Sequence, residues 1–347
     1  MKQRFSGWLN VAVLIAALLF AACQQQPKHT ITRGFYFWKT NVALNDYEAQ
    51  RLRAAGCRRL FVRFFDVQSG PDGQPKPLAI ARLQDAPRNF EITPVVFVVN
   101  DALKTLSTDH VDTLAARMAG LLARQCSDAG ITPREIQIDC DWTATTKDRY
   151  FALLRGLKAQ PFFQDKIVSA TIRLHQVRYI QKTGTPPADR GLLMCYNMGD
   201  TRKSGAHNSI LNVDVARQYL SGLKAYPLPL DVALPLFRWC LLFDGPRFVG
   251  IIRDATPEAA AACAAFERRN AYEFRCLRDT LWYGIALKRG MTVRAEQSDL
   301  SAVKDVATFV AKHLPPKPLS ILLYHADSST LQPFSDDALE EIYRACE

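Results

Sequence analysis

Short apolar runs recur along the chain, and amphipathic or polar segments lie between them. The runs begin near positions 35, 60, 94, 136, 169, 192, 231 and 319. Their length and their content of β-branched and aromatic residues predict eight strands. Helical patterns separate most of these strands, so we predict an α/β fold, a (β/α)8 TIM barrel. A doubly wound open sheet is the alternative.

The segments between the strands have the periodicity and the ends of helices. The segment 45–55 begins at Asn45, a favourable capping residue, and stops at Gly56. The segment 108–129 keeps an apolar stripe and stops at Gly130. Further helices are predicted at 146–159, 211–225, 299–313 and from 336 onward.

Two regions depart from a regular barrel. The segment 67–91 is rich in Gly, Pro and Gln, so the second helix is predicted to be missing or degenerate. The segment 240–298 is too long for one helix; it predicts a β-hairpin around Asp244-Gly245 and an alanine-rich helix near 257–270. We therefore expect one barrel domain over 32–347, with a small α+β insertion between strands seven and eight.

The first 22 residues combine a basic start, a short apolar run and small residues before Cys23. This pattern is typical of a secretory signal rather than of a membrane-spanning helix. The ending Ala21-Ala22-Cys23 resembles a bacterial lipobox, which implies cleavage before Cys23 and lipidation of that cysteine. We expect a lipoprotein signal peptide at 1–22, a tether at 23–31, and a lipid-anchored protein of the bacterial cell envelope, at the outer membrane or the periplasmic face. An ordinary cleaved signal with a chance cysteine is the alternative.

The overall charge is basic, with a formal net charge of +10. The basic residues are spread along the chain without a nucleic-acid-binding signature, so no nucleic-acid partner is expected. Nine cysteines show neither CxxC nor zinc-binding spacing. After lipidation of Cys23, the remaining cysteines could form disulfides in an oxidising compartment, in a pairing that the spacing leaves open.

The fourth strand ends in an unusual row of polar residues, within E-I-Q-I-D-C-D-W at 135–142. Because side chains alternate between the two faces of a strand, one set should face the helices and the other the barrel axis. The first set is Ile136, Ile138 and Cys140. The second set is Gln137, Asp139 and Asp141. A charged inner face needs partners, so this row is unlike simple packing.

Strands five and six add polar residues at the same end of the barrel. Thr171, Arg173 and His175 share one face of strand five, and Met194, Tyr196 and Asn197 end strand six. TIM-barrel enzymes carry their active sites at the carboxyl ends of the strands. These residues are therefore predicted to line a site.

Asp139 and Asp141 are the candidate chemical groups of this site. Residues two apart on a strand lie about 6.6 Å apart at Cα, so each carboxylate acts on the pKa of the other. A carboxylic acid that stays protonated near neutral pH can act as a general acid. The alternative is that these carboxylates form ion pairs with Arg173 or Arg63 and stabilise the barrel mouth.

The run Glu135-x-Gln137-x-Asp139-x-Asp141 resembles the end of the D-x-x-D-x-D-x-E strand of family 18 glycoside hydrolases, the chitinase-like barrels. Met194-x-Tyr196-Asn197 resembles the M-x-Y-D of their sixth strand, and many of them carry an α+β piece between strands seven and eight. From about 33 to 330 the chain is also similar to a family of bacterial lipoproteins predicted to be glycoside hydrolase-like TIM barrels.

This resemblance implies roles for four residues. Asp141 falls at the position of the family's acid and Asp139 at that of the aspartate which assists it. Tyr196 and Asn197 fall where groups that orient the substrate stand. Asp141 replaces a glutamate and is one methylene shorter, and Asn197 replaces an aspartate.

Aromatic and imidazole side chains supply further candidates. Trp38, Trp142 and Trp239 lie at strand ends, where an indole ring can stack on a sugar. His175 and His325 follow strands five and eight, and are interpreted first as polar lining of the site. With Asp139 and Asp141 they could instead form the metal site of a hydrolase, although no metal and no cofactor is expected.

We therefore predict a lipid-anchored, carbohydrate-active protein, a glycoside hydrolase-like enzyme with Asp139, Asp141 and Tyr196 as catalytic residues. Its partners would be a glycan and, through Cys23, a membrane; a monomer is expected. The alternatives are a glycan-binding protein without turnover and a metal-dependent hydrolase. The predicted substrate-binding residues are Trp38, Arg63, Gln137, Trp142, Arg173, His175, Met194, Asn197, Trp239 and His325.

Overall fold

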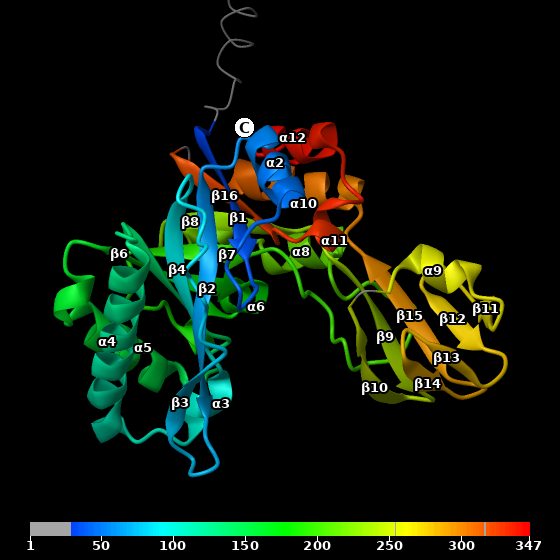
Figure 1. The fold of residues 1–347 in the computed structure, drawn as a ribbon, viewed down its shortest axis with the longest axis horizontal. Helices are drawn as coiled ribbons and strands as arrows, with labels where there is room; N and C mark the ends of the chain where they lie inside the picture. Colours follow the sequence, from blue (N-terminus) through cyan, green and yellow to red (C-terminus); the bar gives the residue numbers. More distant parts are fainter. Residues whose placement is uncertain (1–28, 254, 316) are drawn as a thin grey trace, which may run out of the picture.

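The computed structural model describes residues 29–253, 255–315 and 317–347. Eight parallel strands form a closed barrel (Figure 1). They are β1 (Ile31–Phe37), β2 (Arg59–Ser69), β4 (Glu91–Val98), β5 (Glu135–Asp139), β6 (Ile167–Arg173), β7 (Arg190–Met194), β8 (Leu230–Pro235) and β16 (Leu319–Tyr324). β1 pairs with both β2 and β16, which closes the sheet. The predicted (β/α)8 barrel is confirmed, and the open sheet is wrong.

Helices surround the barrel, and the predicted ones are present except the single helix over 211–225. They are α2 (Asp46–Ala54), α3 (Asn100–Lys104), α4 (Val111–Ala129), α5 (Lys147–Lys158), α6 (Leu174–Arg178), α7 (Ile180–Thr183), α8 (Val213–Tyr219), α10 (Leu300–His313), α11 (Ser328–Leu331) and α12 (Asp336–Arg344). Short 3₁₀ turns cover η1 (Thr108–His110), η2 (Pro161–Phe163) and η3 (Leu223–Ala225). α2 starts at the predicted cap, because the Asn45 side chain accepts from the Glu48 N–H. The prediction of one helix over 211–225 is wrong, since α8 and η3 are separate.

The second crossover has no helix of its own directly after β2. The strand β2 runs on to Ser69, and β3 (Pro75–Leu78) turns back antiparallel to it. This hairpin extends beyond the barrel in Figure 1. The irregularity predicted for helix two is confirmed, since this Gly- and Pro-rich sequence favours a turn over a helix.

An insertion follows β8 and lies beside the barrel (Figure 1). Its strands are β9 (Arg238–Asp244), β10 (Arg247–Ile252), β11 (Phe266–Arg268), β12 (Glu273–Cys276), β13 (Thr280–Trp282), β14 (Ile285–Leu287) and β15 (Thr292–Gln297). It has a separate hydrophobic core, and the predicted hairpin at Asp244-Gly245 joins β9 to β10. The helix α9 (Pro257–Ala262) is shorter than predicted, because the chain enters β11 at Phe266.

The barrel strands carry two different faces. Ile136, Ile138 and Cys140 belong to the large core between strands and helices. A smaller apolar cluster fills the barrel axis, and it includes Tyr36 and Tyr196. The predicted assignment of the fourth strand's apolar residues to the helix side is confirmed.

The predicted signal peptide, Cys23 and most of the tether lie outside the described residues. In the described part of the chain, no helix is long and apolar enough to cross a membrane. The cysteines described there carry free thiols, and all of them are buried except Cys263, which is partly exposed.

Candidate functional site

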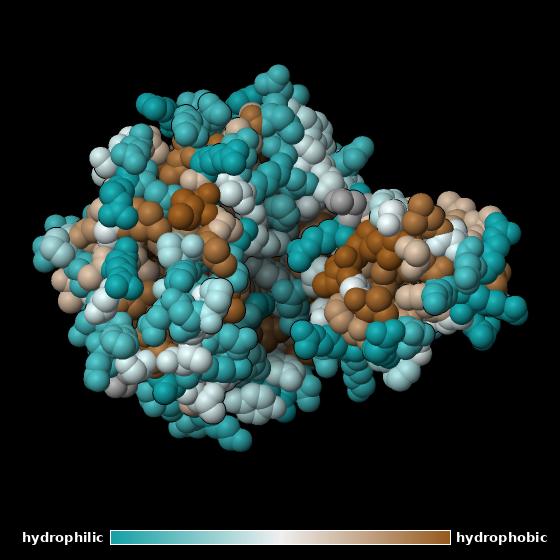
Figure 2. All heavy atoms as spheres, turned by 60° about the horizontal axis from the view of Figure 1, so that its bottom comes forward, coloured by the Kyte–Doolittle hydropathy of each residue, from teal (hydrophilic) through white to brown (hydrophobic). Residues whose placement is uncertain are grey.

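The carboxyl ends of the barrel strands open into a groove bordered by the insertion. Figure 2 looks onto this face and shows a hollow between the barrel and the insertion. The larger pocket there has a volume of about 470 Å³, and a neighbouring pocket of about 350 Å³ extends toward α6 and α8. Both pockets are lined by Arg173, Tyr196 and Asn197. These three residues therefore stand at the centre of the groove.

Asp139, the last residue of β5, lies on the floor of the larger pocket. Its carboxylate accepts a hydrogen bond from the Thr171 hydroxyl at 2.7 Å. Burial raises the pKa of Asp139 to about 7, and the charge of Asp141 adds to this rise, while Arg173 and Thr171 oppose it. This carboxyl group therefore retains a proton close to neutral pH.

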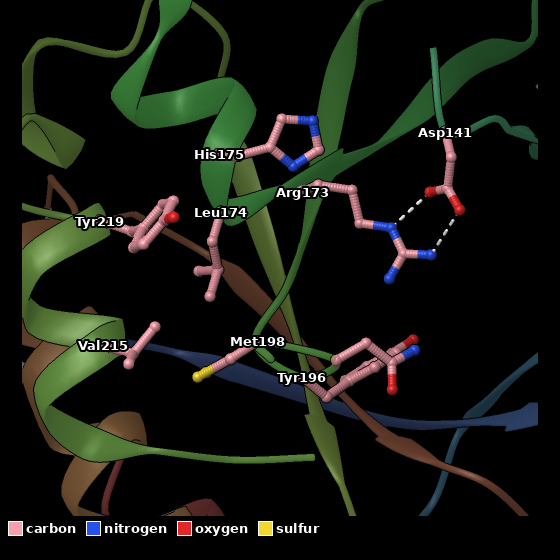
Figure 3. Close-up of a pocket in the computed structure, with 9 residues that line it drawn as sticks. Asp141, Arg173, Leu174, His175, Tyr196, Met198, Val215 and Tyr219 are labelled. Atoms are coloured by element: carbon pink, nitrogen blue, oxygen red, sulfur yellow. Dashed lines mark hydrogen bonds and ion pairs between the residues drawn. The ribbon is translucent and has the colours of Figure 1, made fainter. Parts of the chain in front are cut away.

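Asp141 lies two residues further on and is held by Arg173, from the end of β6. Both side chains line the smaller pocket, and Figure 3 shows the guanidinium turned toward the carboxylate. Arg173 donates from Nε to Oδ1, and from Nη2 to Oδ2 at 2.8 Å. A two-pronged ion pair of this kind is a strong interaction with a fixed geometry. The arrangement is the ion-pair alternative for Asp141, in which both carboxylate oxygens accept hydrogen bonds from Arg173.

Tyr196, two residues beyond β7, lines the groove and has an unused, buried hydroxyl. The residue is 4% exposed, and its hydroxyl has no hydrogen-bond partner among the described residues. Burial raises the pKa of Tyr196 well above its usual value, so the hydroxyl stays protonated. A buried polar group without a partner is unfavourable, and a ligand could supply the missing hydrogen bond. Asn197 follows with a φ of 54°, a left-handed conformation that asparagine tolerates.

Aromatic side chains form much of the wall of the larger pocket. They are Trp38, Phe97, Tyr196, Phe237, Trp239 and Tyr324, with Met194 beside them. The Trp239 indole donates to Glu296 at 2.8 Å, which fixes the orientation of its ring. Trp38 and Trp239 are therefore in the groove, as the sequence suggested.

Trp142 is not in the groove, and its prediction as a sugar platform is wrong. The side chain is fully buried, stacks on Tyr150 at 5.0 Å between ring centroids, and donates to the Thr183 carbonyl at 3.0 Å. The alternation that points Asp141 inward points the next residue outward, toward the helices.

Gln137 and Arg63 also lie away from the groove lining. Gln137 is fully buried inside the barrel, where it accepts a hydrogen bond from the Tyr36 hydroxyl. Arg63 pairs with Asp66 and lies 5.9 Å from the centre of the Trp38 ring. Neither residue is among those that line the two pockets. The burial of Gln137 gives it a structural role instead of the predicted contact with substrate, whereas the substrate-binding role of Arg63 stays a prediction.

The two histidines belong to different parts of the groove. His175 is the second residue of α6, because β6 ends earlier than predicted, at Arg173, and it borders the smaller pocket. His325 follows β16 and borders the larger pocket, with its Nδ1 buried and without a partner among the described residues. Over the described ranges, no three His, Cys, Asp or Glu side chains are grouped closely enough to hold a metal ion.

Several residues that line the larger pocket were missed in the sequence, and four of them matter most for the argument. They are Phe237, Arg238, Arg253 and Tyr324. Tyr324 directly precedes His325 at a strand end, a signal that could have been used. Arg253 lies far along the insertion, and only the fold of the β9–β10 hairpin brings it to the barrel mouth.

No protein-family model matches the sequence, and neither does any curated protein. Solved structures are similar in fold. A chitinase from Chromobacterium violaceum is 14% identical with a TM-score of 0.56, over 90% of this chain and 99% of that one. The spore cortex-lytic enzyme SleL of Bacillus cereus is 13% identical with a TM-score of 0.55, over 90% of this chain and 75% of that one. The C-terminal domain of a putative chitinase from Desulfitobacterium hafniense is 10% identical with a TM-score of 0.58, over 93% of this chain and 100% of that one. At such low identity the likeness shows the fold alone.

Proposed function

We propose that the groove binds a glycan and that the protein is a glycoside hydrolase-like barrel. The observation that carries this proposal is the buried Tyr196 hydroxyl, which lacks a partner in an aromatic groove at the barrel mouth. Sugars present apolar ring faces, which stack on aromatic rings, and hydroxyl groups, which satisfy exposed donors and acceptors. The fold shared with chitinases and with SleL supports the same class of ligand.

Calorimetric titration with a panel of oligosaccharides, including N-acetylglucosamine oligomers, tests this proposal. We expect Tyr196→Phe to bind the preferred glycan about tenfold more weakly, since one buried hydrogen bond to the ligand is lost. Tyr226→Phe is the matched control, because Tyr226 also has a buried hydroxyl without a partner but lies outside both pockets. A protein that binds no member of the panel, or two variants with equal affinity, contradicts the proposal.

Hydrolysis is a second candidate function, favoured by the protonated state of Asp139. With a pKa of about 7, its carboxyl group could give a proton to the oxygen that leaves the broken glycosidic bond. Asp141, which is paired with Arg173, would stabilise the positive charge that develops on the sugar. This assignment exchanges the roles that the resemblance implied for the two aspartates.

Release of reducing ends measures that activity. Asp139→Asn should lower turnover at least about a hundredfold while glycan affinity stays within about threefold. Asp141→Asn should lower turnover, and it should also weaken the ion pair that holds the Arg173 side chain in place. A wild-type protein that binds glycan and releases no reducing ends after prolonged incubation has the binding function alone.

We also propose that Cys23 is lipidated and anchors the protein in the bacterial cell envelope. The support is the pattern of residues 1–23 and the polar stretch behind it. In a bacterial host, labelled palmitate should enter the wild-type protein and not Cys23→Ser. Equal labelling of both would contradict this anchor.

A further inference from the structure

Two arginines are found on the insertion side of the groove. Arg238 begins β9, and Arg253 directly follows the end of β10. In the antiparallel β9–β10 pairing Ile252 faces Cys240, so positions 253 and 238 fall at the same end of the hairpin. Both side chains line the larger pocket.

Neither guanidinium has an acidic partner over residues 29–253, 255–315 and 317–347. Arg238 donates at 3.4 Å to the Ser329 carbonyl, a neutral acceptor. The carboxylates nearest to the groove have other partners. Asp327 pairs with Lys39 at 2.9 Å and accepts from Ser329, Asp141 is held by Arg173, and Asp139 retains its proton near neutral pH.

Both positive charges border the same open groove. A bound anion would supply an acidic partner, and the planar fork of a guanidinium matches the two oxygens of a carboxylate. The neighbouring His325 is neutral, because burial lowers its pKa to about 4 and the charge of Arg253 contributes to this. Its buried Nδ1 is therefore a further unused hydrogen-bonding group in the same pocket.

We propose that Arg238 and Arg253 form a subsite for a carboxylate carried by the sugar, so that the ligand is an acidic glycan. This inference rests on the proposed glycan binding and names the class of glycan. Two kinds of sugar that carry such a group are compared: a uronic acid, with the carboxylate on the ring, and a sugar with a lactyl ether, with the carboxylate on a short arm.

Titration with paired tetrasaccharides tests the subsite and distinguishes these sources. One probe alternates N-acetylglucosamine with glucuronic acid, and the other alternates it with 3-O-lactyl-N-acetylglucosamine. Each is compared with the same compound after reduction of its carboxyl groups to alcohols. The wild-type protein should bind at least one acid form about tenfold more tightly than its reduced form, and this preference should shrink as salt is added.

Three variants assign the preference to the two arginines. Arg238→Gln and Arg253→Gln should each weaken binding of the acid form about threefold or more, and leave binding of the reduced form unchanged. Arg253→Lys should keep part of the preference for the acid form that Arg253→Gln loses, since lysine has the positive charge but not the planar guanidinium. Arg275→Gln, which removes an exposed charge from β12 outside the groove, is the control and should have no effect.

The possible outcomes distinguish failure of the proposed carboxylate subsite from failure of the proposed glycan binding. Equal affinity for acid and reduced forms would overturn the subsite and leave glycan binding in place. An acid preference that survives both glutamine variants would also overturn it. If neither the tetrasaccharides nor the wider panel binds, the proposed function itself fails, and the subsite fails with it.

Discussion

The two ends of the barrel use charged residues in opposite ways, and β5 carries both patterns. At its first residue, Glu135 accepts from Arg59 at 3.0 Å, and Arg59 also donates to Thr93. At its last residue, Asp139 has one hydroxyl partner and a pKa of about 7. The strand therefore begins in a closed ion pair and ends in a carboxyl group that is available to a ligand.

The same contrast extends around the barrel. At the closed end, Asp231 accepts from Arg190 at 3.3 Å and from the Ser320 N–H at 2.8 Å. At the open end, the Tyr196 hydroxyl and His325 Nδ1 have no partner among the described residues. Satisfied buried charges hold the strands together, whereas unsatisfied groups around a cavity are typical of a binding site. We infer that stability and function are divided between the two ends.

The largest effect should follow from breaking the closed end. Glu135→Ala removes the buried carboxylate that pairs with Arg59 and leaves its ion pair with the partly exposed Glu91 at 3.3 Å. The free energy of unfolding should fall by about 3–5 kcal/mol. Denaturant titration measures the loss. Glu341→Ala is the control, because its ion pair with Lys304 is exposed, and should cost less than about 1 kcal/mol. Similar losses of stability in the two variants would show that the buried ion pair at the closed end contributes no more than an exposed ion pair on the surface.

The barrel was predicted from the alternation of strand-like and helical segments, and the residues at its mouth from the alternation of inward and outward side chains along each strand. The rule that places Asp139 and Asp141 inside also excludes Trp142, which has the opposite parity and is buried against Tyr150. The ion pair between Arg173 and Asp141 was one of the alternatives, but the sequence could not choose it, because it depends on the register of β5 against β6 and on the two rotamers. The Arg238–Arg253 pair depends on a hairpin in the insertion, whose orientation toward the barrel has no signature in the local sequence.

A smaller effect, of opposite sign, is expected at the open end. The pKa of Asp139 is higher in the folded protein than in the unfolded chain, so the folded state binds more protons between about pH 4 and pH 7. The protonated Asp139 therefore contributes to the free energy of unfolding at low pH, and this contribution is lost as the pH rises through about 7. Asp139→Asn removes the cost of burying a charged carboxylate. It should stabilise the protein by roughly 1–3 kcal/mol at pH 8 and by little at pH 4.5. Urea titrations at the two pH values measure the difference, and a destabilised variant at pH 8 would show that Asp139 is a structural anion.

The smallest effect on stability should come from the groove tyrosine. Tyr196→Phe removes a buried hydroxyl that bonds to nothing in the described structure, so the free energy of unfolding should change by less than about 0.5 kcal/mol, or rise slightly. Tyr36→Phe is the matched comparison inside the barrel: it takes the donor from Gln137, and should cost about 1–2 kcal/mol. A loss of that size in Tyr196→Phe would mean that its hydroxyl has a bound water or another partner in the free protein. The weaker glycan affinity expected of this variant would then report a structural change, and the open end would resemble the closed one.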